Sequence, residues 1–208
     1  MSELVGDLLF DGPADGPTLV LAHGAGGAMD SEFMQKFATE LGAAGVRVVR
    51  FEFAYMARRR TSDRRPPPDR EAVLLARWRA VVEQLGGGGG LVIGGKSMGG
   101  RMASMVADEL GVRGLVCLGY PFHPPGAPEK TRTAHLAELR TPTLIVQGER
   151  DPFGTRDDIA GYTLSQAIRI SLLAAGNHDL APPAASGRTK RQNWDEAIAT
   201  VAEFVLAR

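Results

Sequence analysis

A serine flanked by glycines is the residue of this sequence best placed to do chemistry. Ser97 lies within residues 95–99, which read Gly-Lys-Ser-Met-Gly, after the apolar run at 91–93 and before a stretch of helical period. A serine hydroxyl is an effective nucleophile only when a base takes its proton, and it must stand clear of the sheet on a sharp turn. Glycine at 95 and 99 avoids Cβ atoms that would collide with the neighbouring strand and helix. The segment predicts a strand, a tight turn with a nucleophilic serine, and a helix.

Two later loops carry an acid and a histidine in the order that such a serine requires. Asp151 and His178 each follow an apolar run, so both loops emerge at the carboxyl edge of a parallel sheet, where the serine turn also lies. Asp151 is preferred to Glu149 because Pro152 fixes the loop directly after it, whereas Glu149 lies only a residue or two beyond its strand. We expect His178 to take the proton of Ser97 while Asp151 holds the other ring nitrogen.

A glycine-rich loop near the N-terminus is the next candidate piece of the site. Residues 23–27 read His-Gly-Ala-Gly-Gly, directly after the first parallel strand that we predict. The amide of Ala25 and the amide of Met98, which begins the helix after the serine, are the candidate donors to an oxyanion. His23 is expected to brace the loop rather than react. Both His23 and Gly24 are candidates for lining the pocket.

Two further histidines lie outside this set. Phe122 and His123 fall in the Pro- and Gly-rich segment 120–128 and are candidates for the pocket wall, although a structural role is the favoured interpretation for His123. His135 is predicted to be a solvated loop or helix residue. No cluster of histidine, cysteine and acidic residues has the spacing of metal ligands, so we expect no metal and no cofactor.

The serine turn also fits the pattern of a phosphate-binding loop, because residues 90–97 match G-x-x-x-x-G-K-S. In such a loop the first glycine follows a strand, and the next four residues form a cradle of exposed amides. Here Gly90 precedes the strand and residues 91–93 belong inside it. The spacing disfavours nucleotide binding at Lys96. A structural alternative remains, in which an ordinary glycine-rich turn carries a capping Ser97.

The elements that must position these residues alternate along the chain. Short apolar runs separated by helical stretches predict a three-layer α/β fold, with a mostly parallel sheet of about six to seven strands and helices on both faces. The expected strands are 18–22, 46–51, 91–94, 114–118, 143–147 and 168–173.

Amphipathic helices are predicted at residues 31–41 and 70–85, after the serine turn, and at the C-terminus. At the start of the last helix, Asn193 and Glu196 resemble a capping box. No linker divides the chain convincingly, so one domain is expected over residues 1–208.

Two segments break the alternation, 55–70 and 120–128, and both are predicted to be loops. The first contains three consecutive prolines and six arginines, namely Arg58, Arg59, Arg60, Arg64, Arg65 and Arg70. Guanidinium groups bind carboxylate and phosphate in bidentate fashion, so an anion-binding rim or a mobile lid is one interpretation of segment 58–70. A solvated loop is the favoured one.

The composition excludes several classes of function. Lysine plus arginine equals aspartate plus glutamate, 24 against 24, so no net field attracts nucleic acid or an anionic membrane. The single cysteine, Cys117, cannot form an internal disulfide, fits a reducing compartment and is expected in the core. The first ten residues have no basic leader, and no apolar run approaches the ~20 residues of a membrane span. A cytoplasmic protein with a small-molecule partner is expected.

With these pieces assembled, the chain resembles the α/β-hydrolase superfamily, and more narrowly its short dienelactone-hydrolase-like predicted hydrolases. The resemblance covers nearly the whole chain, and the shared phrases lie at residues 94–101, 119–126 and 148–154. It implies Ser97 as nucleophile, Asp151 as acid and His178 as base, with the amides of Met98 and Ala25 as oxyanion donors.

The resemblance also bears on the pocket and on activity. Only residues 120–140 are available for a cap, so no full cap domain is expected and the pocket should be open or covered by loops. Eukaryotic relatives of the narrower family include a subunit of a histone-acetyltransferase complex, which leaves a binding or scaffold protein with a protein partner as the alternative. The three retained residue types favour a serine hydrolase that acts on a small ester or thioester.

Overall fold

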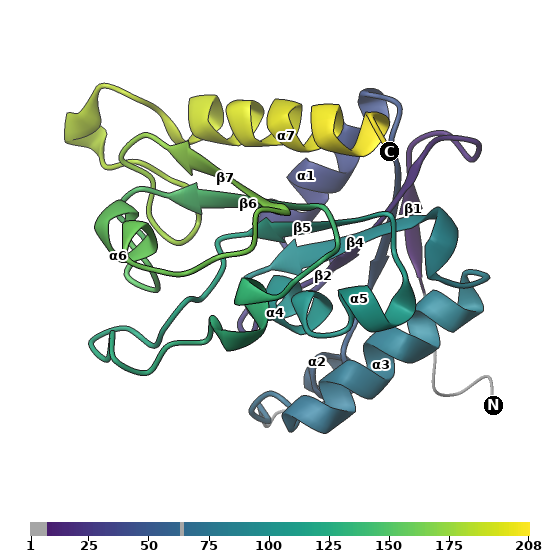
Figure 1. Cartoon of the computed structure of the whole chain (residues 1–208). Coiled ribbons are helices and arrows are strands. Elements are labelled where there is room, and N and C mark those ends of the chain that lie inside the picture. The colour runs from purple at the N-terminus through teal and green to yellow at the C-terminus, as the bar shows by residue number, and fades with distance from the viewer. Residues whose placement is uncertain (1–7, 63–64) are drawn as a thin grey trace.

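One seven-stranded sheet runs through the part of the protein that the computed structural model describes, residues 8–62 and 65–208. The strand order is β1-β3-β2-β4-β5-β6-β7; β1 pairs with β3 in antiparallel fashion, and the remaining pairs are parallel (Figure 1). The strands are β1 (Leu9–Asp11), β2 (Thr18–Ala22), β3 (Arg47–Phe51), β4 (Leu91–Lys96), β5 (Gly114–Leu118), β6 (Thr143–Gly148) and β7 (Ile168–Leu173). The six predicted strands are confirmed to within two residues at each end, and the three-residue β1 is an addition.

Helices cover both faces of this sheet. In Figure 1, α1 and α7 lie on one face, while α3, α4 and α5 lie on the other. The helices are α1 (Glu32–Ala43), α2 (Ala54–Thr61), α3 (Glu71–Gln84), α4 (Met98–Ser104), α5 (Ala107–Leu110), α6 (Arg156–Ala160) and α7 (Lys190–Leu206). This arrangement confirms the predicted three-layer α/β fold.

The central strands are buried on both sides because each contributes to two apolar layers. Val20 and Ile93 belong to the layer that includes Trp78 of α3, whereas Leu19 and Val92 belong to the layer under α1 and α7. Successive side chains on a strand point to opposite faces, so two covered faces require an uninterrupted apolar run. Such runs are the signal from which the sequence predicts the sheet.

The predicted loop 55–70 is wrong in its first half, which forms α2. Arginine is a good helix former, and three arginines in the last turn of α2 complement the negative end of the helix dipole. The cap comes from outside the helix: the Asp69 carboxylate accepts the backbone N–H of Tyr55 at 2.9 Å. A capping residue 14 positions away leaves no local pattern to read. Arg64, within the predicted loop, lies outside the described residues.

The predicted start of α7 is also wrong. The helix begins at Lys190, and its capping box is formed by Thr189 and Gln192 rather than by Asn193 and Glu196. Asn193 is fully buried and its Nδ2 donates to two carbonyls of the preceding loop, 2.9 Å and 3.1 Å away. The amide of Asn193 therefore fixes the loop that carries His178 instead of capping the helix.

Candidate active site

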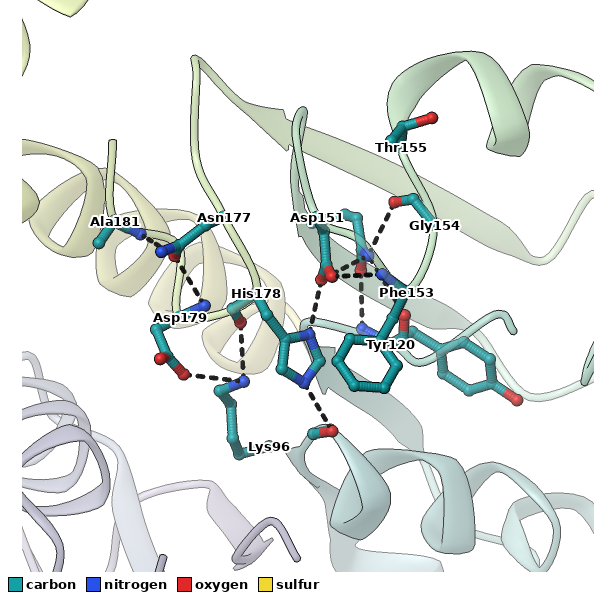
Figure 2. Close-up of polar contacts among 12 residues, drawn as sticks. Lys96, Tyr120, Asp151, Phe153, Gly154, Thr155, Asn177, His178, Asp179 and Ala181 are labelled. Carbon is teal, nitrogen blue, oxygen red and sulfur yellow. Dashed lines mark hydrogen bonds and ion pairs between the residues drawn. The ribbon is translucent and has the colours of Figure 1, made fainter. Parts of the chain in front are cut away.

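The carboxyl edge of the sheet brings together the three residues that the sequence singled out. Ser97 follows β4, Asp151 follows β6 and His178 follows β7. The Nε2 atom of His178 lies 2.8 Å from Ser97 Oγ, and its Nδ1 atom lies 2.8 Å from Asp151 Oδ2. Figure 2 shows the imidazole between the acid and the N-terminal end of α4. The three side chains form one continuous hydrogen-bonded series.

The serine turn is strained in the way that a protruding side chain requires. Ser97 has φ 51° and ψ −116°, a combination that L-residues rarely adopt. Such a backbone costs of order 1–3 kcal/mol and persists only where surrounding structure holds it. The backbone N–H of Ser97 donates to Leu118 of β5 at 2.9 Å, which ties the turn to the sheet.

The glycines on either side of the turn are required by close backbone contacts. A Cβ at Gly95 would lie 2.4 Å from the carbonyl oxygen of Ala22, and one at Gly99 would lie 2.5 Å from the same atom. Backbone at these distances cannot give way as a flexible side chain could. The predicted reason for both glycines is therefore correct.

The acid is held by more than the histidine. Asp151 is fully buried; Gln147 Nε2 donates to its Oδ2 at 2.9 Å, and the Phe153 N–H donates to its Oδ1 at 2.9 Å. The Phe153 ring also covers the imidazole of His178, with ring centroids 4.2 Å apart (Figure 2). Sequence reasoning missed Gln147, whose signal is a polar side chain near the end of an otherwise apolar strand.

Glu149, the rejected acid, has different partners. Its carboxylate is paired with Arg156 and accepts the backbone N–H of Ala175 at 2.9 Å. It therefore bridges the acid loop to the segment before His178 without touching the imidazole series.

Lys96 ties the serine turn to the histidine loop. Its Nζ donates to the backbone carbonyl of His178 at 2.7 Å and lies 3.3 Å from Asp179 Oδ1 (Figure 2). Burial lowers the pKa of the Lys96 ammonium, against the opposing effect of Asp179. The sequence pattern points to Lys96 only as a phosphate ligand and does not predict this contact.

The phosphate-loop alternative does not describe this turn. Residues 91–96 form β4, paired with β2 and β5 in register, so their amides serve the sheet rather than a phosphate cradle. The Lys96 ammonium is directed at His178 and Asp179.

A pocket of about 640 Å³ opens beside Ser97. Its wall combines the glycine-rich loop after β2, the start of α1, the histidine loop and the start of α7. Three aromatic residues contribute to it, Phe33, Phe153 and Trp194. Gly24 lines the pocket as predicted, whereas His23, also predicted there, is fully buried and does not line it. Ala25, predicted as an oxyanion donor, is part of the pocket wall. The pocket wall at α1 and α7 was not predicted.

Charged side chains with acidic or basic partners lie on the same wall of the pocket. Lys190 Nζ lies 2.8 Å from Glu32 Oε1 and 4.0 Å from the centre of the Trp194 ring. The Lys96 ammonium similarly lies 5.5 Å from the centre of the Phe33 ring. The pocket thus offers aromatic faces whose neighbouring cations already have acidic partners.

Phe122 and His123 do not line this pocket. Both are buried, and His123 is fixed by Pro124 O, 2.8 Å from its Nδ1, and by Asp158, 3.4 Å from its Nε2. The structural interpretation of His123 is the correct one. His135 is half-buried rather than solvated: its Nε2 lies 2.9 Å from Ser104 Oγ, and neither residue lines the pocket.

The described residues, 8–62 and 65–208, contain no group of three or more histidine, cysteine, aspartate or glutamate residues able to hold a metal ion. None of their helices has both the length and the apolar character needed to cross a bilayer.

Comparisons with known proteins identify the family of this chain. A family model described as an alpha/beta hydrolase domain matches residues 15–206. Similar solved structures include a dienelactone hydrolase from Anabaena variabilis, 20% identical with a TM-score of 0.71 over 96% of this chain and 92% of that one. A serine hydrolase without a lid from Xanthomonas campestris is 17% identical, with a TM-score of 0.69 over 97% and 88%.

A third similar structure is Est1E from Butyrivibrio proteoclasticus with ferulic acid bound, 15% identical with a TM-score of 0.70 over 97% of this chain and 92% of that one. At these identities the solved structures establish a shared fold, and the family model, which spans most of the sequence, establishes descent. The chain belongs to the α/β-hydrolase superfamily.

Proposed function

We propose that this protein is a serine hydrolase that cleaves small esters or thioesters through an acyl-enzyme on Ser97. The observation that carries the proposal is the series of two 2.8 Å hydrogen bonds from Asp151 through His178 to the serine hydroxyl. A nucleophile within reach of a base, and a base oriented by a third group, is the arrangement that activates a hydroxyl.

The hydrogen-bond partners define the starting protonation state. An ionised Asp151 only accepts, so the proton on the imidazole of His178 lies at Nδ1, and Nε2 presents its lone pair to Ser97. As Oγ bonds to the substrate carbonyl carbon, its proton moves to Nε2. The buried carboxylate of Asp151 then faces an imidazolium, which it stabilises without taking the proton.

The remaining steps restore the enzyme. The amides of Ala25 and Met98 hold the oxyanion, because one lies on the pocket wall and the other opens a helix where no intrahelical acceptor exists. The tetrahedral intermediate collapses, and the proton on His178 passes to the departing alcohol or thiol. Water then attacks the acyl group by the same route, and Ser97 recovers its hydrogen.

The pocket favours compact substrates. Residues 119–142, between β5 and β6, contain only a short 3₁₀ turn at Ala134–Ala137, so no cap domain closes over Ser97. A ring on the acyl or leaving group can pack against Phe33, Phe153 and Trp194, as aromatic faces favour. We therefore propose short-chain or aromatic acyl groups.

A panel of activated esters and thioesters, with acetyl, butyryl, long-chain and aromatic acyl groups, tests the proposal. We expect hydrolysis of the short and aromatic members, and a kcat lower by at least about 1000-fold in Ser97→Ala, because the nucleophile is absent. Ser104→Ala is the matched control, since Ser104 also contacts a histidine but does not line the pocket. Equal turnover by wild type and Ser97→Ala would refute the proposed function.

A further inference from the structure

Two carbonyl oxygens of the glycine-rich loop, those of Gly24 and Ala25, are held by side chains from outside the loop or at its start. His23 Nδ1 lies 2.7 Å from Gly24 O, and the hydroxyl of Tyr55 in α2 lies 3.1 Å from the same oxygen. That hydroxyl is also 3.2 Å from Ala25 O, which accepts Arg59 Nη1 at 3.1 Å. Two consecutive carbonyls are thus held on the side of the loop that faces α2.

These carbonyls determine where the next amides point. A trans peptide unit is planar, and its C=O and N–H are directed to opposite sides. A Gly24 carbonyl fixed towards Tyr55 therefore directs the Ala25 N–H away from α2, and Ala25 lies on the wall of the pocket beside Ser97. The orientation of the amide is set by the partners of a carbonyl one residue earlier.

We propose that Tyr55 is a positioning residue, which aims the Ala25 amide at the oxyanion through its hydrogen bonds to the carbonyls of Gly24 and Ala25. The reading of that amide as an oxyanion donor rests on the proposed function. The orientation of the amide itself depends only on the contacts of the loop.

The chemistry of Tyr55 suits this role. Its side chain is fully buried, and burial raises the pKa of its hydroxyl, so the proton that it donates stays in place. The Arg59 guanidinium lies 5.0 Å from the centre of the Tyr55 ring while donating to Ala25 O. Helix α2 thereby presents two donors, one turn apart, to the loop.

His23 also holds the carbonyl of Gly24, and its contacts require a single tautomer. Its Nε2 accepts the backbone N–H of Phe53 at 3.1 Å, so the ring proton must lie on Nδ1, where it donates to Gly24 O. Desolvation lowers the pKa of His23 and keeps the ring neutral in this arrangement.

The far end of the loop is anchored by the same region of the chain. Arg50 Nη1 donates to Met29 O at 2.7 Å, and the Met29 N–H donates to Glu52 Oε1 at 3.3 Å. Arg60 of α2 in turn donates to both Glu52 and Asp30. Arg59 and Arg60, weighed above as an anion-binding rim, hold the loop in shape.

Tyr55→Phe tests the inference, with Tyr120→Phe as the matched control. Tyr120 is an equally buried tyrosine whose hydroxyl donates to a backbone carbonyl, Arg132 O, at 3.0 Å, away from the glycine-rich loop. Both variants lose one buried hydroxyl, so any general effect on stability should be shared. An effect seen only in Tyr55→Phe is therefore due to the lost hydrogen bonds with the glycine-rich loop.

The first readout is the orientation of the Ala25 N–H vector, measured by residual dipolar couplings in solution. We expect the Ala25 coupling to change in Tyr55→Phe and to match wild type in Tyr120→Phe. An unchanged coupling in Tyr55→Phe overturns the inference. This readout needs no substrate, so it decides the matter even if the protein hydrolyses no ester.

The second readout is ester turnover. Deleting an oxyanion donor lowers kcat by about 100- to 1000-fold, and loosening one should lower it less. We expect Tyr55→Phe to lose about 10-fold in kcat with KM within a factor of two, and Tyr120→Phe to retain the wild-type kcat. Equal kcat values in the two variants of an active enzyme would contradict the positioning role. Inactivity of the wild type would instead refute the proposed function.

Discussion

At the scale of single residues, the central feature is how firmly the imidazole of His178 is placed. Asp151 bonds its Nδ1, and the Phe153 ring covers one face. Lys96 holds the carbonyl of His178 itself, and Asn193 holds the loop carbonyls on either side of it. Under the proposed function, an imidazole held from several directions meets the Ser97 hydroxyl without first ordering itself, which would lower the barrier to proton transfer.

Asp151→Asn probes the choice of acid. The amide keeps the size of the carboxylate, but it cannot stabilise an imidazolium and can favour the wrong tautomer, so we expect kcat to fall by about 1000- to 10,000-fold. The variant should still fold, because Asn retains an oxygen to accept from Gln147 or Phe153. Steady-state kinetics and a thermal melt measure both expectations.

Glu149→Gln is the control for that experiment. Glu149 is the other acid of the same loop, and its contacts to Arg156 and Ala175 do not reach His178. We expect it to keep turnover within about threefold of wild type, since glutamine retains an oxygen for the Ala175 N–H and a largely exposed pair with Arg156 contributes little. A larger loss in Glu149→Gln than in Asp151→Asn would reverse the assignment.

At this scale, the meeting of the three side chains was predictable from the order of residue types along the chain. Ser97, Asp151 and His178 follow β4, β6 and β7, and the carboxyl ends of these parallel strands lie at the same edge of the sheet. Gln147 and the contact of Lys96 with His178 could not be read, because each depends on side-chain direction across the sheet. His123 shows the converse, because a suitable residue type near this edge can be buried without lining the pocket.

At the scale of elements, the turn between β4 and α4 is the most tightly constrained part of the backbone at the site. The strained backbone of Ser97 persists because the flanking glycines let β4, α4 and β2 approach closely. The strand and the helix around it were predictable from periodicity. The position of α2 was not, because its N-terminal cap comes from Asp69 and its partner is the loop after β2.

Gly99→Ala should disrupt the turn. The added Cβ would lie 2.5 Å from Ala22 O and 2.6 Å from His23 O, both backbone atoms, so strand and helix must separate. We expect a loss of about 1–3 kcal/mol in the free energy of unfolding, as overpacking typically costs, and reduced turnover. Denaturant unfolding measures the first and ester kinetics the second.

The matched control is Gly89→Ala, in the 3₁₀ turn before β4. A Cβ there meets no atom within 4 Å, and the residue has an ordinary φ. We expect stability equal to wild type or slightly higher, because alanine restricts the unfolded chain. If both variants unfold alike, the close approach at Gly99 is not the reason for the glycine.

At the scale of the whole molecule, the architecture was predictable from the sequence, whereas the wall of the pocket was not. The architecture is determined by two apolar layers, one on each face of the sheet. Both layers were predictable from the apolar runs of the strands. The pocket wall was not, because it joins the start of α1 to the start of α7, about 160 residues later in the chain. Local sequence patterns cannot predict a contact between segments so far apart in the chain. Loops at such a pocket determine substrate specificity.

The most direct test of the central claim, that Ser97 is the nucleophile, is the site at which a fluorophosphonate probe attaches. Peptide mapping by mass spectrometry should place one adduct on Ser97 in wild type and in Ser104→Ala, since only the serine activated by His178 attacks phosphorus. Ser97→Ala should remain unlabelled. An adduct on another residue, or labelling of Ser97→Ala at the wild-type rate, would contradict the account.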